Sequence, residues 1–278
     1  MGAVSAELER VAREAGADLR MNSTVEHIEV RDDGVTVTGD GFELVADHVL
    51  SGVAPYVLAG LVGDPLPARP SGSQFKINLL VSRLPQLRSG DDPNVAFAGT
   101  FHINEAMSQL EGLHSAAKMG RAPFASGEIY CHTLTDRSIL GPDLAAADAQ
   151  TLTYFGLQTP YDNLPDDAAG EAAYRRFLDS LDAYLAEPLE PLILGVEHKT
   201  PAQVEAELAM PGGNIFHGGI AWPWLEEDEK PHTPAERWGV ATAHDRVLMC
   251  GSGARRGGNV SGISGHHAAH ALLEILGH

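Results

Sequence analysis

The stretch 247-VLMCGSGARRGGNVSGISGHHAA-269 decides the fold. Its first residues are apolar and typical of a short buried strand, and its last residues are typical of a helix. The segment between them is rich in glycine, which lets a backbone approach a ligand because no Cβ stands in the way. A helix N-terminus adds unpaired backbone N–H groups and the positive end of the helix dipole. The order strand, glycine turn and helix therefore predicts a cradle for a phosphate, a pyrophosphate or an electron-rich ring edge.

Three other motifs do not fit this stretch. Gly251-Ser-Gly-Ala-Arg-Arg lacks the third glycine of G-x-G-x-x-G at the expected offset, and the stretch contains no Gly-Lys-Ser/Thr of a P-loop. It also lacks the G-x-S-x-G elbow of a serine hydrolase after the strand. A glycine-rich turn that serves only tight packing stays open as the alternative.

Hydrophobic periodicity before this stretch predicts a mixed α/β chain. Asp32-Asp33-Gly34 predicts a hairpin turn because its glycine can adopt positive φ. The proline-rich segment 64–70 (DPLPARP) is the best boundary in the chain. The elements expected before it are a helix over 3–15, strands over 17–20, 26–31, 35–38, 42–46 and 48–51, and a short helix over 56–61.

The segment beyond the boundary combines strands with longer helices. Residues 75–84 (FKINLLVSRL) predict a buried strand, and an apolar stripe predicts a helix at about 171–186. Thr200-Pro-Ala-Gln predicts a helix start, with threonine as N-cap and proline in the first turn. The other elements expected here are strands over 95–102, 128–135, 192–198 and 246–250, and helices over 107–117 and at the C-terminus.

Composition limits the class of partner. The 278 residues carry 19 Lys and Arg against 38 Asp and Glu, a formal net charge of −19. Nucleic acids and anionic membranes are bound through clustered basic side chains, so this charge argues against both. The two cysteines are too few for a disulfide framework, and no stretch approaches the ~18 apolar residues of a membrane span. The cytoplasm is therefore the expected location, with no strong membrane anchor.

The glycine stretch resembles the C-terminal flavin-binding signature of the phytoene-desaturase-like FAD-dependent oxidoreductases. In that family a strand leads into a Cys/Gly-x-Gly turn, a Pro/Gly-Gly-Gly-Val-x-Gly run and a helix beginning with Ala-Ala, and residues 250–269 follow the same order. Further similarity lies in residues 1–28, 46–55, 76–79 and 210–218. The nearest subgroup is the pyridine nucleotide-disulfide oxidoreductase domain-containing protein 2 type.

This resemblance implies an α/β fold (α+β mixed) with FAD as cofactor. A partial FAD-binding domain, residues 1–70 and 201–278, would be interrupted by a substrate domain of a β-sheet with helices, residues 71–200. Hydride would pass to FAD from a small hydrophobic or amine-like substrate. The cofactor-binding residues implied are Val25, Gly251, Gly253, Gly257, Gly258, Val260, Gly262 and Gly265.

Lys76 and His217 are the catalytic candidates that the resemblance implies, because both fall at family-like positions. An ionisable group near a flavin ring could orient the substrate or accept a proton. An ordinary hydrogen-bonded role is the alternative for each.

The sequence departs from the family in one respect. The family's N-terminal half begins with a strand, G-x-G-x-x-G and a helix that grip the FAD pyrophosphate, and this sequence has no such segment. We therefore expect the C-terminal portion of a longer enzyme or one gene of a split pair, with the dinucleotide-binding half as its partner. The alternative is a non-catalytic interaction or regulatory module that keeps the fold without binding flavin.

A histidine-rich run near the C-terminus raises the question of a metal site. His266, His267 and His270 form H-H-x-x-H, which places His266 and His270 one helical turn apart, as two zinc ligands would be. Neither a general-base glutamate nor an obvious third ligand accompanies them. The helix that follows the glycine stretch explains these residues equally well, so no metal site is predicted.

Overall fold

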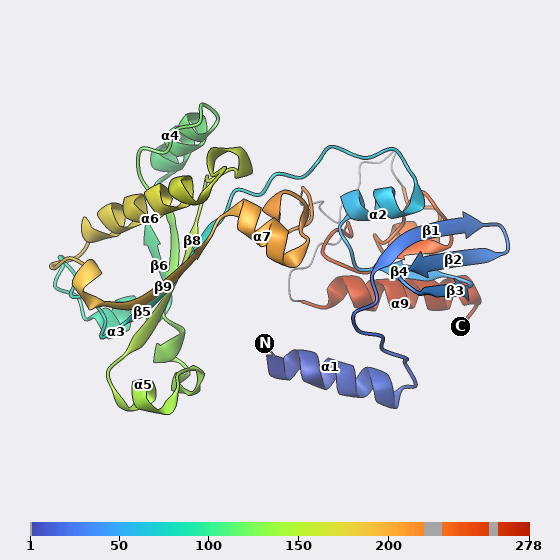
Figure 1. The fold of residues 1–278 in the computed structure, drawn as a ribbon, viewed down its shortest axis with the longest axis horizontal. Helices are drawn as coiled ribbons and strands as arrows, with labels where there is room; N and C mark the ends of the chain where they lie inside the picture. Colours follow the sequence, from blue (N-terminus) through green and yellow to red (C-terminus); the bar gives the residue numbers. More distant parts are fainter. Residues whose placement is uncertain (1, 220–229, 256–260) are drawn as a thin grey trace.

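The computed structural model describes residues 2–219, 230–255 and 261–278. The fold is mixed α/β, as predicted, with sheets of three, two and five strands. Figure 1 shows two parts, joined by the extended segment that follows α2 (Pro55–Val62) and by the region around α7 (Pro201–Leu208). Each part has its own cluster of buried apolar side chains.

The first part contains an antiparallel three-stranded meander and a parallel pair of short strands. The predicted hairpin joins the first two strands of the meander, with Asp32 and Asp33 as its turn. Gly34 is the first residue of the second strand and does not have the positive φ expected for it. Helices α2 and α9 (Ile263–Leu276) contribute Leu58, Ala268 and Ala271 to the cluster buried beside these strands. The strands are β1 (Val25–Arg31), β2 (Gly34–Gly39), β3 (Phe42–Ala46), β4 (Val49–Ser51) and β10 (Val247–Met249).

The second part is a five-stranded antiparallel sheet in the order β6-β7-β8-β5-β9. Residues on β5 alternate strictly between buried and half-buried, as a strand covered on one face requires. Helix α6 (Asp167–Asp182) buries Phe177 and Leu181 against the covered face. The strands are β5 (Phe75–Val81), β6 (Thr100–Ile103), β7 (Gly127–Tyr130), β8 (Gln150–Gly156) and β9 (Ile193–Lys199).

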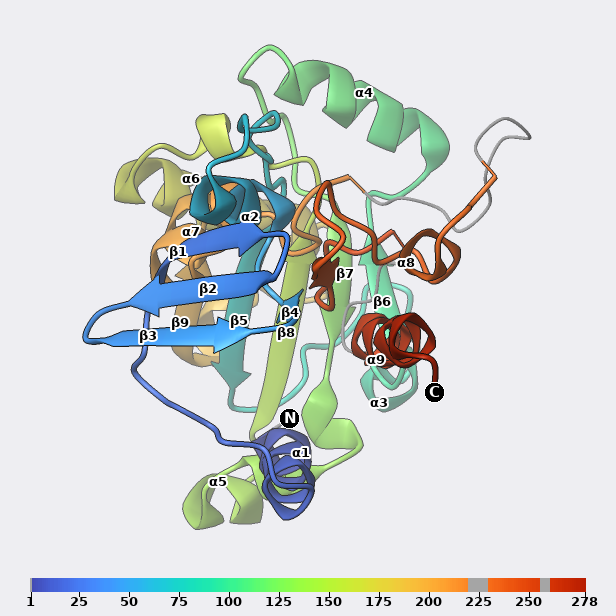
Figure 2. The same ribbon diagram turned by 90° about the vertical axis from the view of Figure 1, so that its right-hand side faces the viewer.

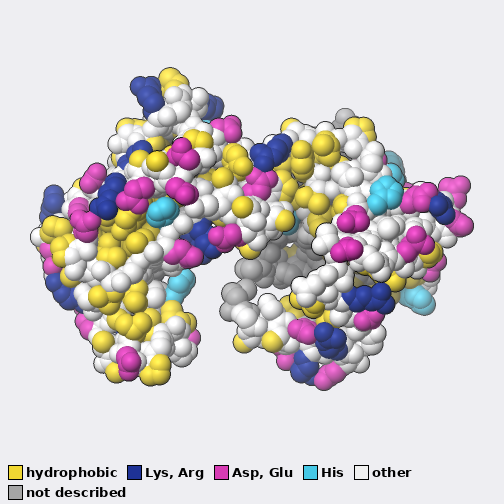
Figure 3. All heavy atoms as spheres, viewed as in Figure 1, with side chains coloured by type: hydrophobic (Ala, Val, Ile, Leu, Met, Phe, Trp, Pro, Cys, Tyr) yellow, Lys and Arg dark blue, Asp and Glu magenta, His cyan; other side chains and the backbone are white. Residues whose placement is uncertain are grey.

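The opposite face of this sheet is turned toward the first part of the molecule. Figures 1 and 2 agree that α6 lies on the far side of the sheet, while β4 and α9 lie on the side of its other face. The space-filling view shows an open gap between the two parts (Figure 3). The half-buried side chains of the sheet therefore face the part that carries the glycine-rich stretch.

The helices start where local capping favours them. Thr200 forms the predicted capping box at the start of α7, because its hydroxyl accepts from the Gln203 N–H and the Gln203 side chain accepts from the Thr200 N–H. The remaining α-helices are α1 (Gly2–Glu14), α3 (Pro93–Ala96), α4 (Met107–Ala117), α5 (Pro142–Ala146) and α8 (Pro234–Arg237). Short 3-10 turns lie at 132–134, 137–139, 161–163, 190–192 and 211–213.

Four sequence predictions need correction. Residues 17–20 form no strand, and the strand predicted over 95–102 is shortened by α3, which Asp92 caps and Pro93 starts. The strand predicted over 128–135 ends at Tyr130 and continues as a 3-10 turn. The prediction also missed β8, although it pairs with both β5 and β7.

Helix α1 forms as predicted, but its apolar face is exposed. Val4, Leu8 and Val11 keep 55%, 67% and 48% of their surface accessible, and the helix buries none of its residues. Within the described residues, none of the helices has the length and apolar character needed to span a membrane.

Candidate functional site

The candidate site begins where β4 and β10 end side by side. The two strands run parallel, with Val247 opposite Val49 and Met249 opposite Ser51. The Cys250 N–H continues the pairing by donating to the Ser51 carbonyl at 2.8 Å. Gly52 and Gly251 then follow at adjacent strand ends. Ligands of open α/β sheets bind outside the carboxyl ends of parallel strands, so this is the edge where a cofactor is expected.

A hollow of about 180 Å³ opens at this edge. Helix α9 begins beside it, with Gly262 as N-cap in the left-handed conformation (φ 72°). The first turn of a helix has backbone N–H groups without intrahelical acceptors, which favours an anion or an electron-rich ring edge. The hollow is lined by Gly52, His217, Cys250, Gly251, Ser252, Ser261, Gly262, Ser264 and Gly265.

His217 is the ionisable side chain that lines this hollow together with the thiol of Cys250. Its backbone is left-handed (φ 64°), and its N–H donates to the Asn214 carbonyl at 2.9 Å. Its Nδ1 atom is buried and has no hydrogen-bond partner within the described part of the chain. Burial lowers the pKa of His217, so a neutral imidazole is favoured at pH 7. A neutral ring with an unused nitrogen is suited to hydrogen-bond a heterocycle edge.

Cys250 completes the polar lining. Burial raises the pKa of its thiol above the ordinary value, so the thiol stays protonated at neutral pH. A protonated, partly buried cysteine is a poor nucleophile. The hollow is therefore a binding surface and not a thiolate reaction centre.

The predicted glycines divide into two classes. A Cβ at Gly251 would lie 2.4 Å from the Gly52 carbonyl oxygen, and a Cβ at Gly253 would lie 2.4 Å from Pro55 Cδ. Tight packing alone therefore accounts for glycine at 251 and 253. Among the described residues, a Cβ at Gly265 would meet only the Cys250 carbonyl oxygen, at 3.9 Å, and a Cβ at Gly262, whose φ is +72°, would meet nothing within 4 Å. At these two positions the open space lies on the hollow, where a ligand can approach the backbone.

The structure gathers some of the predicted site residues and separates others. His217, Gly251, Gly262 and Gly265 line one hollow. Lys76 lies on β5 in the other part of the molecule, with its Nζ 5.6 Å from the centre of the Phe155 ring. Val25 starts β1 and packs against the buried cluster of the first part. The predicted cofactor residues Gly257, Gly258 and Val260 lie outside the described residues.

A larger hollow of about 790 Å³ adjoins the same glycine turn. Gly253 and Arg255 line it, opposite apolar side chains of α2 such as Leu58. His244 lines it too and places its Nε2 3.0 Å from the Asp64 carboxylate. Because it is larger than the hollow at α9, it has room for a bulkier part of a ligand.

The histidine-rich run packs against an aromatic ring. His270 stacks on Trp238 with ring centroids 5.4 Å apart, and the His266 and His270 centroids are 4.3 Å apart. Packing against Trp238 accounts for their place on α9. Sequence reasoning missed a different cluster, His102, Glu105 and Glu128, because Glu128 reaches the other two only through the pairing of β6 with β7.

Comparison with known proteins gives the site its context. Residues 1–85 match the family model described as flavin containing amine oxidoreductase. An uncharacterized protein of Mycobacterium tuberculosis is 44% identical over 292 residues, which cover 99% of this chain and 54% of that protein. Pyridine nucleotide-disulfide oxidoreductase domain-containing protein 2 of Rattus norvegicus is 28% identical over 300 residues, covering 99% of this chain and 50% of that protein. The chain thus spans about half the length of the curated relatives it matches.

A solved structure extends the comparison to the fold. A variant of putrescine oxidase with redesigned cofactor binding superposes with a TM-score of 0.54 and 16% identity, over 97% of this chain and 52% of that one. The sequence match of residues 1–85 and the shared fold confirm the predicted resemblance to flavin-dependent oxidoreductases. The chain shares the fold of the matched half of that oxidase, and its first 85 residues match the flavin containing amine oxidoreductases in sequence.

Proposed function

We propose that this chain forms the flavin-ring side of an FAD-dependent oxidoreductase of the phytoene-desaturase-like type. The observation that carries the proposal is the hollow between the ends of β4 and β10 and the start of α9, where Gly262 and Gly265 leave the backbone open to a ligand. When bound, FAD supplies the acceptor for a hydride taken from a small hydrophobic or amine-like substrate. The match of residues 1–85 to flavin containing amine oxidoreductases supports this class of chemistry.

The residues of the hollow have distinct roles in this proposal. The first turn of α9 stabilises negative charge through its N–H groups and dipole. His217 offers its buried Nδ1 to a polar atom of the ring. The apolar wall of α2 near Leu58 excludes water from the neighbouring hollow. Lys76, half-buried on β5, is the residue that we propose to orient substrate or hold a proton.

We also propose a partner for this half-site. A strand–GxGxxG–helix segment would supply the pyrophosphate clamp that this sequence does not contain. This chain covers about half the length of its relatives, which supports a search for that segment in a longer chain or in a separate one. The two free cysteines support a reducing compartment, and we propose the cytoplasm.

A competing function is a non-catalytic module that keeps the fold. The specific observation in its favour is that Gly251 and Gly253 are needed for packing whether or not a ligand binds. The two functions differ at Gly265, where the described residues leave room for a Cβ and do not require glycine for packing. A substitution there tests flavin binding without disturbing the strand ends.

The test is a flavin titration of the purified chain, alone and with the dinucleotide-binding segment, followed by visible absorption and fluorescence quenching. In Gly265→Ala the methyl group intrudes on the hollow, so we expect FAD affinity to fall about tenfold or more. The same change should keep or raise the free energy of unfolding, because alanine favours a helix over glycine by roughly 1 kcal/mol.

The matched control is Gly112→Ala, since Gly112 lies in α4 and a Cβ there meets no described atom within 4 Å. It should gain the same helical stability and leave FAD binding unchanged. Absence of flavin bands in both samples would reject the oxidoreductase and favour the non-catalytic module. If Gly265→Ala and the wild type bind FAD with equal affinity, the proposal that FAD binds beside the start of α9 is wrong.

A further inference from the structure

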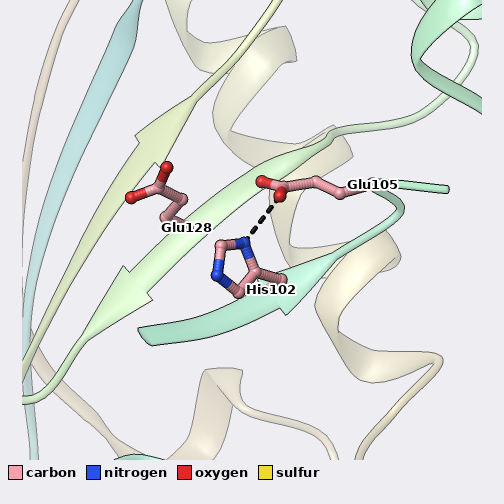
Figure 4. Close-up of side chains that lie close together, drawn as sticks. All are labelled: His102, Glu105 and Glu128. Carbon is pink, nitrogen blue, oxygen red and sulfur yellow. Dashed lines mark hydrogen bonds and ion pairs between the residues drawn. The ribbon is translucent and has the colours of Figure 1, made fainter. Parts of the chain in front are cut away.

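A compact cluster of metal-ligand side chains lies in the second part of the molecule. His102 lies on β6, Glu105 follows the end of that strand, and Glu128 lies on the neighbouring strand β7 (Figure 4). One potential ligand atom from each of the three residues lies within 4.8 Å of the others. The strand register places His102 directly opposite Glu128, so the two side chains share one face of the sheet. The cluster therefore joins two strands and the turn that follows β6.

The turn that returns Glu105 toward His102 is held by an independent network. Asn104 adopts the left-handed conformation (φ 55°), and its Nδ2 donates to the Ala125 carbonyl at 2.7 Å. The Tyr184 hydroxyl donates to Asn104 Oδ1 at 2.8 Å. Glu105 Oε2 then lies 2.6 Å from His102 Nδ1. The turn that carries Glu105 is thus held by the contacts of Asn104 with Ala125 and Tyr184, which involve none of the three candidate metal ligands.

The two carboxylates lack a compensating basic side chain. Among the described residues, neither Glu105 nor Glu128 forms an ion pair with a lysine or an arginine, and Glu105 pairs only with His102. Glu105 Oε1 is buried and has no hydrogen-bond partner in the described part of the chain. A buried carboxylate oxygen without a donor is costly, and a cation would satisfy it.

The neighbouring basic side chain is directed elsewhere. The register continues from Glu128 to Phe155 and from Phe155 to Lys76 across the same face of the sheet. Lys76 lies against the Phe155 ring, which separates it from the carboxylates. The Tyr130 hydroxyl donates to Glu128 and brings no positive charge to the cluster. The cluster is therefore a locally anionic site with one imidazole.

We propose that His102, Glu105 and Glu128 bind a divalent transition-metal ion, with zinc as the best match. Imidazole nitrogen and carboxylate oxygen are both zinc ligands, and three protein ligands leave one position for water. Ligand atoms of a tetrahedral zinc site with bonds of about 2.0–2.1 Å lie about 3.3 Å apart. The 2.6 Å contact between His102 and Glu105 therefore opens slightly as the ion replaces the shared proton.

The experiment titrates the purified chain with Zn²⁺ by calorimetry and repeats the titration with Co²⁺, whose visible absorption reports coordination geometry. We expect one tight equivalent in the wild type. His102→Ala, Glu105→Gln and Glu128→Gln should each weaken it at least about tenfold. Metal-free thermal unfolding of each variant checks that the fold is intact. The readout needs no flavin, so it is independent of the proposed oxidoreductase activity.

Two control variants separate this site from ordinary histidine binding. His270→Ala removes one member of the histidine-rich run on α9. Glu171→Gln removes a carboxylate that lies 3.7 Å from His198 Nε2 and belongs to no three-ligand cluster within the described residues. Both should keep the tight equivalent. Loss of that equivalent in His270→Ala with retention in His102→Ala would place the ion on α9 and overturn the proposal. Equal affinity of wild type and His102→Ala would also overturn it.

Discussion

The two parts of the molecule bury their apolar side chains to very different extents. Among the described residues, the cluster against the five-stranded sheet contains 21 buried residues and the cluster around β4 and β10 contains ten. The larger cluster includes fully buried phenylalanines, whereas the smaller one is completed by alanines of α9. Acidic side chains spread over both parts, so charge does not distinguish them (Figure 3).

The proposed cofactor site lies in the part that has the smaller core. The hollow at α9 is bounded by two strands of three residues each and by helix α9. Regions with few buried apolar contacts open at lower free energy than the core of a domain. We therefore expect the flavin-side part to gain stability from a ligand, and the sheet part to be stable by itself.

The largest expected effect is at Phe177. This ring is fully buried on α6, with its centroid 4.3 Å from that of Tyr154 on β8. Phe177→Ala should lower the free energy of unfolding by about 3–5 kcal/mol, because it removes a large side chain and leaves a cavity. Chemical denaturation gives the magnitude, and hydrogen exchange shows where protection is lost.

The location of that loss tests the comparison of the two parts. Protection should fall over residues 75–192 and persist at β10, because the two clusters share no residue. Phe177→Leu is the control and should cost much less. Equal loss of protection in both parts would show that they unfold as one unit.

The sequence predicted best those elements whose signals are local. The hairpin after β1 and the capping box between Thr200 and Gln203 depend on neighbours in the chain. Both formed, although the hairpin does not use a positive φ at Gly34. Helix α4 also has the predicted bounds, Met107–Ala117. Strand β8 was missed, although Thr-Leu-Thr-Tyr-Phe at 151–155 is rich in β-branched and aromatic residues.

A candidate site could be predicted from the sequence only where its residues lie in one continuous segment with a recognisable motif. The glycine stretch identified Gly262 and Gly265, but their difference from Gly251 and Gly253 is visible only from the atoms that surround each Cβ. The His102 cluster has no sequence signal of comparable strength, because Glu128 joins it through strand register. Long-range pairing is what the pattern of one sequence does not encode directly.

A smaller effect is expected at the Arg83–Glu187 pair, which ties the end of β5 to the chain after α6. The two oxygens of Glu187 accept from Arg83 at 2.6 and 2.8 Å, and one also accepts from the Gln86 N–H. Chiefly the Arg83 bonds, and then the Gln86 bond, lower the pKa of Glu187 to about 2. Because both side chains are partly exposed, Glu187→Gln should cost about 1 kcal/mol or less at pH 7.

The pH dependence gives this prediction its sign. The folded-state pKa lies below the ordinary value of 4.5, so the stabilisation is present above about pH 4.5 and is lost as the pH falls toward about 2. Denaturation of wild type and Glu187→Gln at several pH values should show the two free energies converging over this range. A constant difference would mean that the pair acts through packing. A double-mutant cycle with Arg83→Gln isolates the pairwise contribution.

The smallest effect is expected at Leu8 on α1. This side chain is 67% exposed, whereas Leu181 on α6 is fully buried. Leu8→Ala removes apolar surface while keeping a good helix former, so it should change the free energy of unfolding by no more than about 0.5 kcal/mol. Leu181→Ala, the matched change in a buried helix face, should cost about 2–5 kcal/mol.

The expected difference between the two leucines is wrong if Leu8→Ala lowers the free energy of unfolding by more than about 1 kcal/mol. A cost of that size needs apolar area removed from water, at roughly 25 cal/mol for each Å². Within the described residues α1 buries none of its side chains, so such a cost would require another surface over Val4, Leu8 and Val11. Repeating the melts over a range of protein concentrations identifies that surface as a second copy if the stability of wild type, but not of Leu8→Ala, rises with concentration.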